Sequence, residues 1–248
     1  MSRTLRAASA LACFVLSACA QLAAPGFAPI AGEDEAMRAR VERAVAEAAD
    51  RQSLRAVGKL RVEGPKGSGS VKQVVLVERP TRLRLETLNM LGQAATMLVT
   101  DGQRFAFFDG KSLDDGDVSA EVLRERLGLA FTPSEAVGAL LAAPQPVKWP
   151  PRAILARGAE RAVLLDDQSL RFAEDGELAA IEALDAQGAV LWSAEYAAWR
   201  DVPGGRYPFK VVLVFPETKL RAEFELSKAE LNQPLDASLF RASRGAVP

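Results

Sequence analysis

Arg82-Leu83-Arg84-Leu85-Glu86 decides the fold class, because its apolar and charged residues alternate one by one. A period of two predicts a strand that buries one face and exposes the other to water. The same alternation occurs upstream in Lys59-Leu60-Arg61-Val62-Glu63. By contrast, Val74-Val75-Leu76-Val77 has no polar interruption, which indicates burial on both faces. These stretches together predict a sheet with one extensive apolar face.

Strand patterns continue on both sides of this stretch and are separated by turn signals. Asp101-Gly102, Asp175-Gly176 and Gln187-Gly188 are such signals, because Gly and Asp favour tight turns between strands. The predicted strands cover residues 54–63, 71–78, 82–86, 93–100, 104–108, 153–157, 162–165, 169–173, 178–184, 190–199, 207–215 and 220–228. Short consecutive strands with tight turns predict an antiparallel meander and argue against a parallel sheet with alternating helices.

Three helices are predicted besides the strands. Residues 33–51 carry apolar residues at helical spacing, a pattern typical of a helix packed on a sheet. This apolar face consists of Met37, Val41, Ala44, Val45 and Ala48. Ser119 and Gly128 are suitable caps for a second helix, and Thr132-Pro133-Ser134-Glu135 is a capping box that begins a third. The chain is therefore predicted to be mainly β (α+β): a large curved antiparallel sheet forming an unclosed half-barrel, with three helices covering its concave apolar face.

The concave face of this sheet has two alternative interiors. The helices can fill it as a solid core, or they can leave a cavity beneath them. The residues predicted to line such a cavity are Leu60, Val62, Leu83, Leu85, Phe105, Phe107, Val122, Leu123, Leu140 and Trp192. The apolar pattern alone favours the solid core, since it demands nothing more of these side chains.

The segment Leu88-Asn89-Met90-Leu91-Gly92 is unusual for a turn between two strands. Turns favour residues such as Asn89 and Gly92, but Leu88, Met90 and Leu91 are large and apolar. One alternative is that the loop folds back and buries these side chains. The other is an apolar tip held in solvent, available to a membrane or an acyl chain. The sequence favours neither.

The N-terminus predicts export and membrane attachment. Arg3 and Arg6 precede an apolar run over residues 7–15, which is too short to span a bilayer and is typical of a cleaved signal peptide. Leu16-Ser17-Ala18-Cys19 follows and resembles the lipobox of bacterial lipoproteins. The predicted organisation is a signal peptide over 1–18, lipidated Cys19 with a flexible tether over 19–32, a single domain over 33–240 and a tail over 241–248.

Composition excludes several classes of function. The chain has no histidine, which rules out Ser-His-Asp and Cys-His catalysis. Removal of Arg3 and Arg6 would leave 29 basic residues against 32 acidic ones, a net charge of −3 without a basic block, so nucleic-acid binding is not supported. Asp114, Asp115 and Asp117 are interpreted as a loop, and Asp166-Asp167 as a turn. Since no metal-ligand spacing or phosphate-binding loop is present, we expect no cofactor, no metal and no enzymatic activity.

Four segments together resemble the LolB family of outer-membrane lipoprotein receptors, within the LolA/LolB-like superfamily. The segments are residues 58–62 with the Gly/Ser turn after them, residues 83–92 including Asn89-Met90-Leu91-Gly92, the helix pair over 119–141, and the late strands over 188–196 and 207–215. Their order and spacing behind the lipobox carry the likeness, which extends from about Glu33 to Phe240.

The resemblance implies a non-catalytic role at the periplasmic face of the outer membrane, with anchoring by lipidated Cys19. Members of this family receive the acyl chains of lipoproteins from a soluble periplasmic carrier and help insert the lipoproteins into the membrane. Leu91 matches the protruding loop leucine of the family, with Leu88 and Met90 beside it. Acylated lipoproteins, the carrier and outer-membrane lipid are the expected partners of a monomer. The alternative is an accessory lipoprotein with a filled core that acts through contacts with other proteins.

Overall fold

A computed structural model describes residues 26–241 except 66, 90 and 130, and over these residues the chain is mainly β. The strands are β1 (Ala28–Pro29), β2 (Ser53–Gly64), β3 (Gly67–Glu78), β4 (Arg82–Leu88), β5 (Ala94–Thr100), β6 (Arg104–Phe108), β7 (Leu113–Asp117), β8 (Ala153–Arg157), β9 (Glu160–Leu164), β10 (Gln168–Phe172), β11 (Leu178–Leu184), β12 (Val190–Val202), β13 (Gly205–Phe215) and β14 (Leu220–Leu231). The helices are α1 (Asp34–Asp50), α2 (Ala120–Leu127), α3 (Pro133–Leu140) and the short 3-10 helix η1 (Ala237–Phe240).

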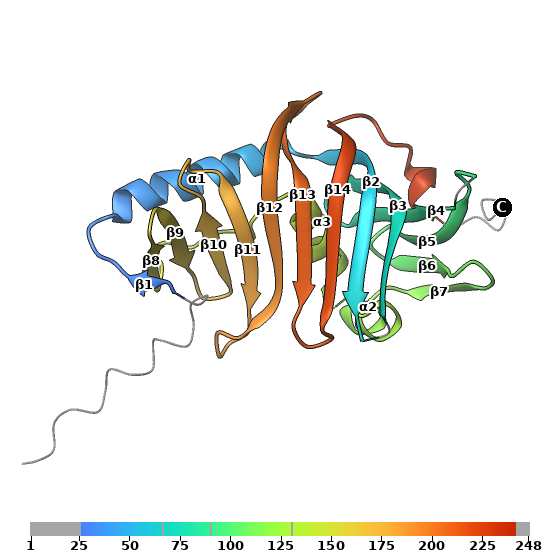
Figure 1. Cartoon of the computed structure of the whole chain (residues 1–248), viewed down its shortest axis with the longest axis horizontal. Helices are drawn as coiled ribbons and strands as arrows, with labels where there is room; N and C mark the ends of the chain where they lie inside the picture. Colours follow the sequence, from blue (N-terminus) through green and yellow to red (C-terminus); the bar gives the residue numbers. More distant parts are fainter. Residues whose placement is uncertain (1–25, 66, 90, 130, 242–248) are drawn as a thin grey trace, which may run out of the picture.

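The described strands form one antiparallel sheet that does not close on itself (Figure 1). Its order is β1-β8-β9-β10-β11-β12-β13-β14-β2-β3-β4-β5-β6-β7, so β1 and β7 are its two edges. The chain starts its meander at β2 in the middle, runs to the β7 edge, and returns through β8 at the other side. The last strand, β14, then pairs with β2 over Leu54 to Glu63. The predicted unclosed antiparallel sheet is confirmed.

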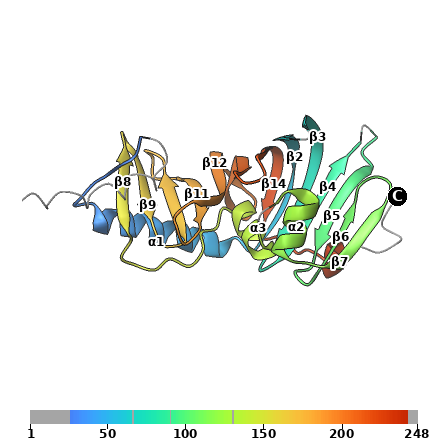
Figure 2. The same ribbon diagram turned by 90° about the horizontal axis from the view of Figure 1, so that it is seen from below.

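The three α-helices of the described residues lie on one side of the sheet (Figures 1 and 2). Met37, Val41, Ala44 and Ala48 of α1 are buried, and they join residues of α3 and of the sheet in the main core. The apolar face of α1 repeats every three or four residues, so its buried side chains extend along the helix from Met37 to Ala48. None of the helices over the described residues is long and apolar enough to cross a bilayer.

A second, smaller core lies on the opposite face of β3, β5 and β6. Successive residues of a strand point to opposite faces, so Val75 enters the main core while Leu76 faces away from it. Phe240 of η1 packs over Leu76 and Met97 there and is almost fully buried. Arg84 Nη1 also donates to the carbonyl oxygen of Leu239 at 2.8 Å. The C-terminal segment up to Phe240 is therefore packed against the sheet.

Three local expectations were wrong. Part of the predicted tether is folded, because Ala28 and Pro29 pair with β8. The predicted acidic loop is the edge strand β7, where Arg104 pairs with both Asp115 and Asp117 and offsets their mutual repulsion. Strand β3 also begins earlier than expected, since its Gly/Ser segment from Gly67 still pairs with β2.

Candidate functional site

Side chains of the sheet and of the α3 region enclose an apolar cavity of about 270 Å³. Leu83 and Leu85 are two residues apart on β4 and therefore share the face that lines it. The cross-strand pairs Leu85–Leu98 and Leu98–Phe107 extend this wall through β5 to β6. The lining residues are Leu60, Val62, Gln73, Leu83, Leu85, Thr87, Thr96, Leu98, Phe107, Leu129, Phe131, Ala136, Leu140, Leu213, Leu220, Ala222 and Phe224. Several of them are only half-buried, so solvent reaches the cavity.

Helix α3 and the segment before it form the cover of the cavity. The predicted capping box is present: Glu135 N donates to Thr132 Oγ1 at 3.2 Å, and Thr132 N donates to Glu135 Oε2 at 2.8 Å. This box fixes the start of α3, which presents Ala136 and Leu140 to the cavity. Phe131 precedes the box and packs edge-on against Phe215, with ring centroids 4.9 Å apart.

Three buried polar side chains hold the end of α3. Arg51 Nε donates to the carbonyl oxygen of Leu141 at 2.8 Å, and its Nη2 donates to that of Ala142 at 3.0 Å. Tyr196 Oη donates to Ala139 O at 2.8 Å, and Tyr207 Oη donates to Leu140 O. The last carbonyls of a helix lack partners within it and carry partial negative charge, so a cation and two hydroxyls satisfy them well.

Burial governs the ionisation of this cluster. It lowers the pKa of the Arg51 guanidinium from its ordinary value, while Tyr207 and Glu47 nearby oppose that shift. Burial also raises the pKa of both Tyr196 and Tyr207, which keeps their hydroxyl groups protonated as donors. The cluster is thus a fixed structural support for α3 near neutral pH, with Arg51 charged and both tyrosines neutral.

The loop between β4 and β5 presents Leu91 to solvent, with 84% of its surface exposed. Asn89 Oδ1 accepts hydrogen bonds from the backbone N–H groups of Leu91 at 2.9 Å and Gln93 at 3.0 Å. Gly92 adopts a φ of +79°, which favours glycine, and its N–H donates to Asn89 O. Asn89 and Gly92 therefore hold the backbone in a defined turn while the apolar Leu91 side chain stays in water. Leu88 is half-buried, and Met90 lies outside the described residues.

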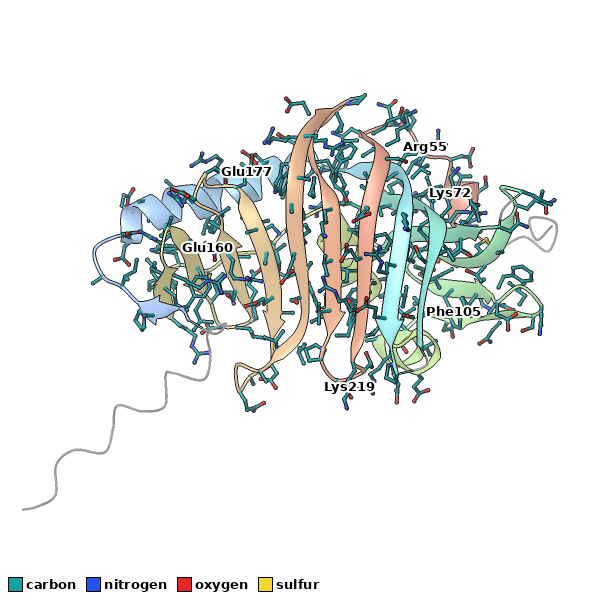
Figure 3. The ribbon with its side chains drawn as sticks, in the orientation of Figure 1. Arg55, Lys72, Phe105, Glu160, Glu177 and Lys219 are labelled. Atoms are coloured by element: carbon teal, nitrogen blue, oxygen red, sulfur yellow. The ribbon has the colours of Figure 1, made fainter. Side chains whose placement is uncertain are left out.

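Six of the ten residues predicted to line the cavity do so: Leu60, Val62, Leu83, Leu85, Phe107 and Leu140. The other four lie elsewhere. Phe105, labelled in Figure 3, is buried beside Gly116 of β7. Trp192 lies behind Phe131, with ring centroids 6.0 Å apart, and its Nε1 donates to Glu135 Oε1. Val122 and Leu123 of α2 do not line the cavity, because the segment after that helix supplies Leu129 and Phe131 instead. Cys19 lies outside the described residues.

The prediction missed the other lining residues, Gln73 among them, and also Arg51. Gln73 and Arg51 carry the same signal in the sequence. Arg51 follows Ala44 and Ala48 at helical spacing, so a charged residue occupies a position on the buried face of α1. Gln73 alternates with Val75 and Val77, so a polar amide side chain lies on the same buried face of β3 as these valines. A polar residue on the face of a helix or strand that is otherwise apolar indicates a buried polar interaction. This signal would have identified both Arg51 and Gln73.

Other hollows and clusters offer less chemistry. A depression of about 420 Å³ beside β6 and β7 has Asp101, Arg104 and Asp115 in its wall. A wider one of about 770 Å³ is lined mostly by polar and charged side chains. Over the described residues, no group of three or more carboxylates or other metal-binding side chains is placed to hold a metal ion. The apolar cavity is therefore the best candidate site.

Comparison with solved structures shows which proteins share this fold. A LolA superfamily protein from Nitrosomonas europaea matches with a TM-score of 0.51 and 12% identity, covering 81% of this chain and 97% of that one. A proposed outer membrane lipoprotein-sorting protein domain from Vibrio parahaemolyticus matches with a TM-score of 0.51 and 10% identity, covering 82% and 94%. A DUF1329 family protein from Desulfovibrio piger matches with a TM-score of 0.54 and 7% identity, covering 88% and 100%.

In sequence, no protein-family model and no curated protein matches the chain. At identities this low, the likeness concerns the fold and leaves the function to the site itself. The chain thus shares its fold with a LolA superfamily protein, and over the described residues this fold is an unclosed antiparallel sheet with helices on one side.

Proposed function

We propose that this chain is a non-catalytic lipoprotein receptor that binds acyl chains of lipoproteins in the apolar cavity and helps insert them into the outer membrane. The observation that carries the proposal is the cavity itself, of about 270 Å³, in which all but three lining residues are apolar. Gln73, Thr87 and Thr96 are the exceptions. Such a lining suits a hydrocarbon chain and leaves little for a charged ligand.

Burial of hydrocarbon supplies the binding energy. Each methylene group moved from water into the cavity stabilises the complex by ~0.8 kcal/mol. Release then requires a second apolar environment, and a membrane is one. Leu91, at the tip of the loop between two cavity strands, is the contact with that membrane. Its 84% exposure is unfavourable in water unless the side chain has a partner.

Anchoring at Cys19 would keep the cavity within reach of the bilayer. The lipobox at residues 16–19 supports this part of the proposal, as does the short stretch between Cys19 and β1. A soluble periplasmic carrier would deliver the acylated cargo. The accessory role with a filled core is less favoured, because the core on this face leaves a cavity beside α3.

Transfer of an acylated lipoprotein to vesicles tests this function. The purified full chain is loaded with the lipoprotein and mixed with vesicles of outer-membrane phospholipids. We expect Leu91→Glu to retain binding but to lose most of the transfer. Leu191→Glu is the matched control, because Leu191 is also exposed, at 45%, but lies at the start of β12. Equal transfer by both variants would contradict the role of Leu91, and no loading of the unaltered chain would contradict the function.

A further inference from the structure

Gln73 is a buried polar side chain in the wall of the apolar cavity. The residue is 2% exposed, and its side chain lies on the apolar face of β3. Its Nε2 donates to the carbonyl oxygen of Val74 at 3.2 Å. Its Oε1 is also buried and, among the described residues, finds no hydrogen-bond partner. A buried acceptor without a partner is destabilising and is rare in native proteins, so its presence in a binding cavity points to a ligand.

The orientation of the Gln73 amide is set by its neighbour. Only the NH₂ group can donate to Val74 O, so this contact leaves the oxygen as the free end. Reversal of the amide would place two acceptors, Oε1 and Val74 O, against each other. Gln73 lines the cavity, so the wall holds at this position a buried acceptor that has no partner among the described residues.

Gln73 belongs to a polar row that crosses the wall at one level. It is the cross-strand partner of Thr87 on β4, and Thr87 is the partner of Thr96 on β5. The two threonines satisfy each other, because their hydroxyl oxygens are 2.7 Å apart and Thr96 N donates to Thr87 Oγ1 at 3.0 Å. Gln73 Oε1 is thus the member of the row that still needs a donor.

The next row of the wall is apolar. In the next inward-facing row, which is farther from the β4–β5 loop, Leu85 of β4 is the cross-strand partner of Val75 on β3 and of Leu98 on β5. The polar row therefore lies between this hydrocarbon surface and the loop that bears Leu91. A ligand that matches both rows has an apolar tail against Leu85 and Leu98 and a polar linkage near Gln73.

We propose that Gln73 Oε1 accepts a hydrogen bond from the secondary amide N–H that joins an acyl chain to a peptide, an inference that rests on the function proposed above. Ester and carboxylate oxygens only accept hydrogen bonds, so ester-linked chains leave Oε1 without a partner. The site thereby selects amide-linked acyl chains over ester-linked ones, and it places the amide end of the ligand toward the Leu91 loop.

Competition for the cavity tests the selection. A dansyl-labelled fatty acid bound to the purified full chain is displaced with either N-ethyl dodecanamide or ethyl dodecanoate, which differ only in N–H against O. We expect the amide to compete about tenfold better, the factor that one unsatisfied buried acceptor corresponds to. N-dodecanoyl tripeptide is a third competitor. The tripeptide should compete at least as well as N-ethyl dodecanamide. If only N-ethyl dodecanamide competes, the site binds N-acylated amines and the proposed peptide ligand is wrong.

Substitution of Gln73 locates the effect. Gln73→Leu should bind both competitors equally, because no acceptor remains, whereas Gln103→Leu, at an exposed glutamine outside the cavity wall, should keep the amide preference. If Gln73→Leu fails to fold, the comparison of amide and ester on the unaltered chain decides alone. If the amide and the ester compete equally for the unaltered chain, for example because water donates to Oε1, the proposed role of Gln73 is wrong. The function proposed above would still stand. Failure of the dansyl probe to bind would overturn both.

Discussion

Replacement of Arg51 by methionine should destabilise the protein by about 3 kcal/mol. The side chain keeps similar bulk but no longer donates to Leu141 O and Ala142 O, whose residues are 0% exposed. Each buried carbonyl left without a donor costs ~1–3 kcal/mol, and relief of the buried charge offsets part of the sum. The contact to Arg206 O, at 3.4 Å, is too long to add much.

Urea unfolding measures this effect. The midpoint for Arg51→Met should fall while the slope of the free energy of unfolding against urea stays unchanged. Arg55→Met is the matched control, because Arg55, labelled in Figure 3, is exposed on β2, and we expect a change within ~0.5 kcal/mol. Amide hydrogen exchange of α3 should also become faster in Arg51→Met. Equal stability of the two variants would refute the view that Arg51 holds the end of α3.

Three further predictions concern the sheet and the cavity. Gly58→Ala should lower the free energy of unfolding, measured in urea, by ~1–3 kcal/mol, because the new Cβ would lie 2.4 Å from Glu225 O. Gly69→Ala is the control and should leave it unchanged, because nothing lies within 4 Å of its Cβ. Equal effects of the two substitutions would argue against the close approach at Gly58. The hydrogen bond from Lys210 and the nearby Arg221 lower the pKa of Glu223, so Glu223→Gln should lose stability at pH 7, and its difference from the unaltered chain should shrink as pH falls below ~4.3. A difference independent of pH would contradict that ion cluster. Leu85→Trp should fill the cavity and weaken binding of a fluorescent fatty acid at least tenfold, with Leu191→Trp as the control; unchanged binding would place the ligand elsewhere.

Most of the sheet could be predicted from the sequence because its local signals agree with one another. The alternation around Leu83 and Leu85 sets the buried face of β4, and the capping box at Thr132 sets the start of α3. Edge strands were harder. β7 contains three aspartates, and its pairing depends on Arg104 of the neighbouring strand, which no local pattern reveals.

The site was predictable in part. The period of each strand identifies which residues face inward, but it does not tell whether facing helices fill the space between them. Trp192 is the clearest case, because it faces inward yet lies behind Phe131. The exposure of Leu91 likewise depends on how Asn89 holds the loop, and the residue types alone do not specify these hydrogen bonds. Arg51 and Gln73 were visible as polar residues at positions where the pattern predicts apolar ones. The carbonyl groups that Arg51 contacts, however, are distant in sequence.

Photo-crosslinking in cells shows directly whether acyl chains of lipoproteins enter the cavity. Lipoproteins that carry a photoactivatable group at the end of an acyl chain are irradiated in cells that produce the full chain, and the labelled peptides are mapped by mass spectrometry. We expect labels on the cavity walls, within residues 83–88, 94–100 and 129–140, and a strong reduction of labelling in Leu85→Trp. Labels confined to the opposite face of the sheet, or none above an unirradiated control, would contradict this expectation.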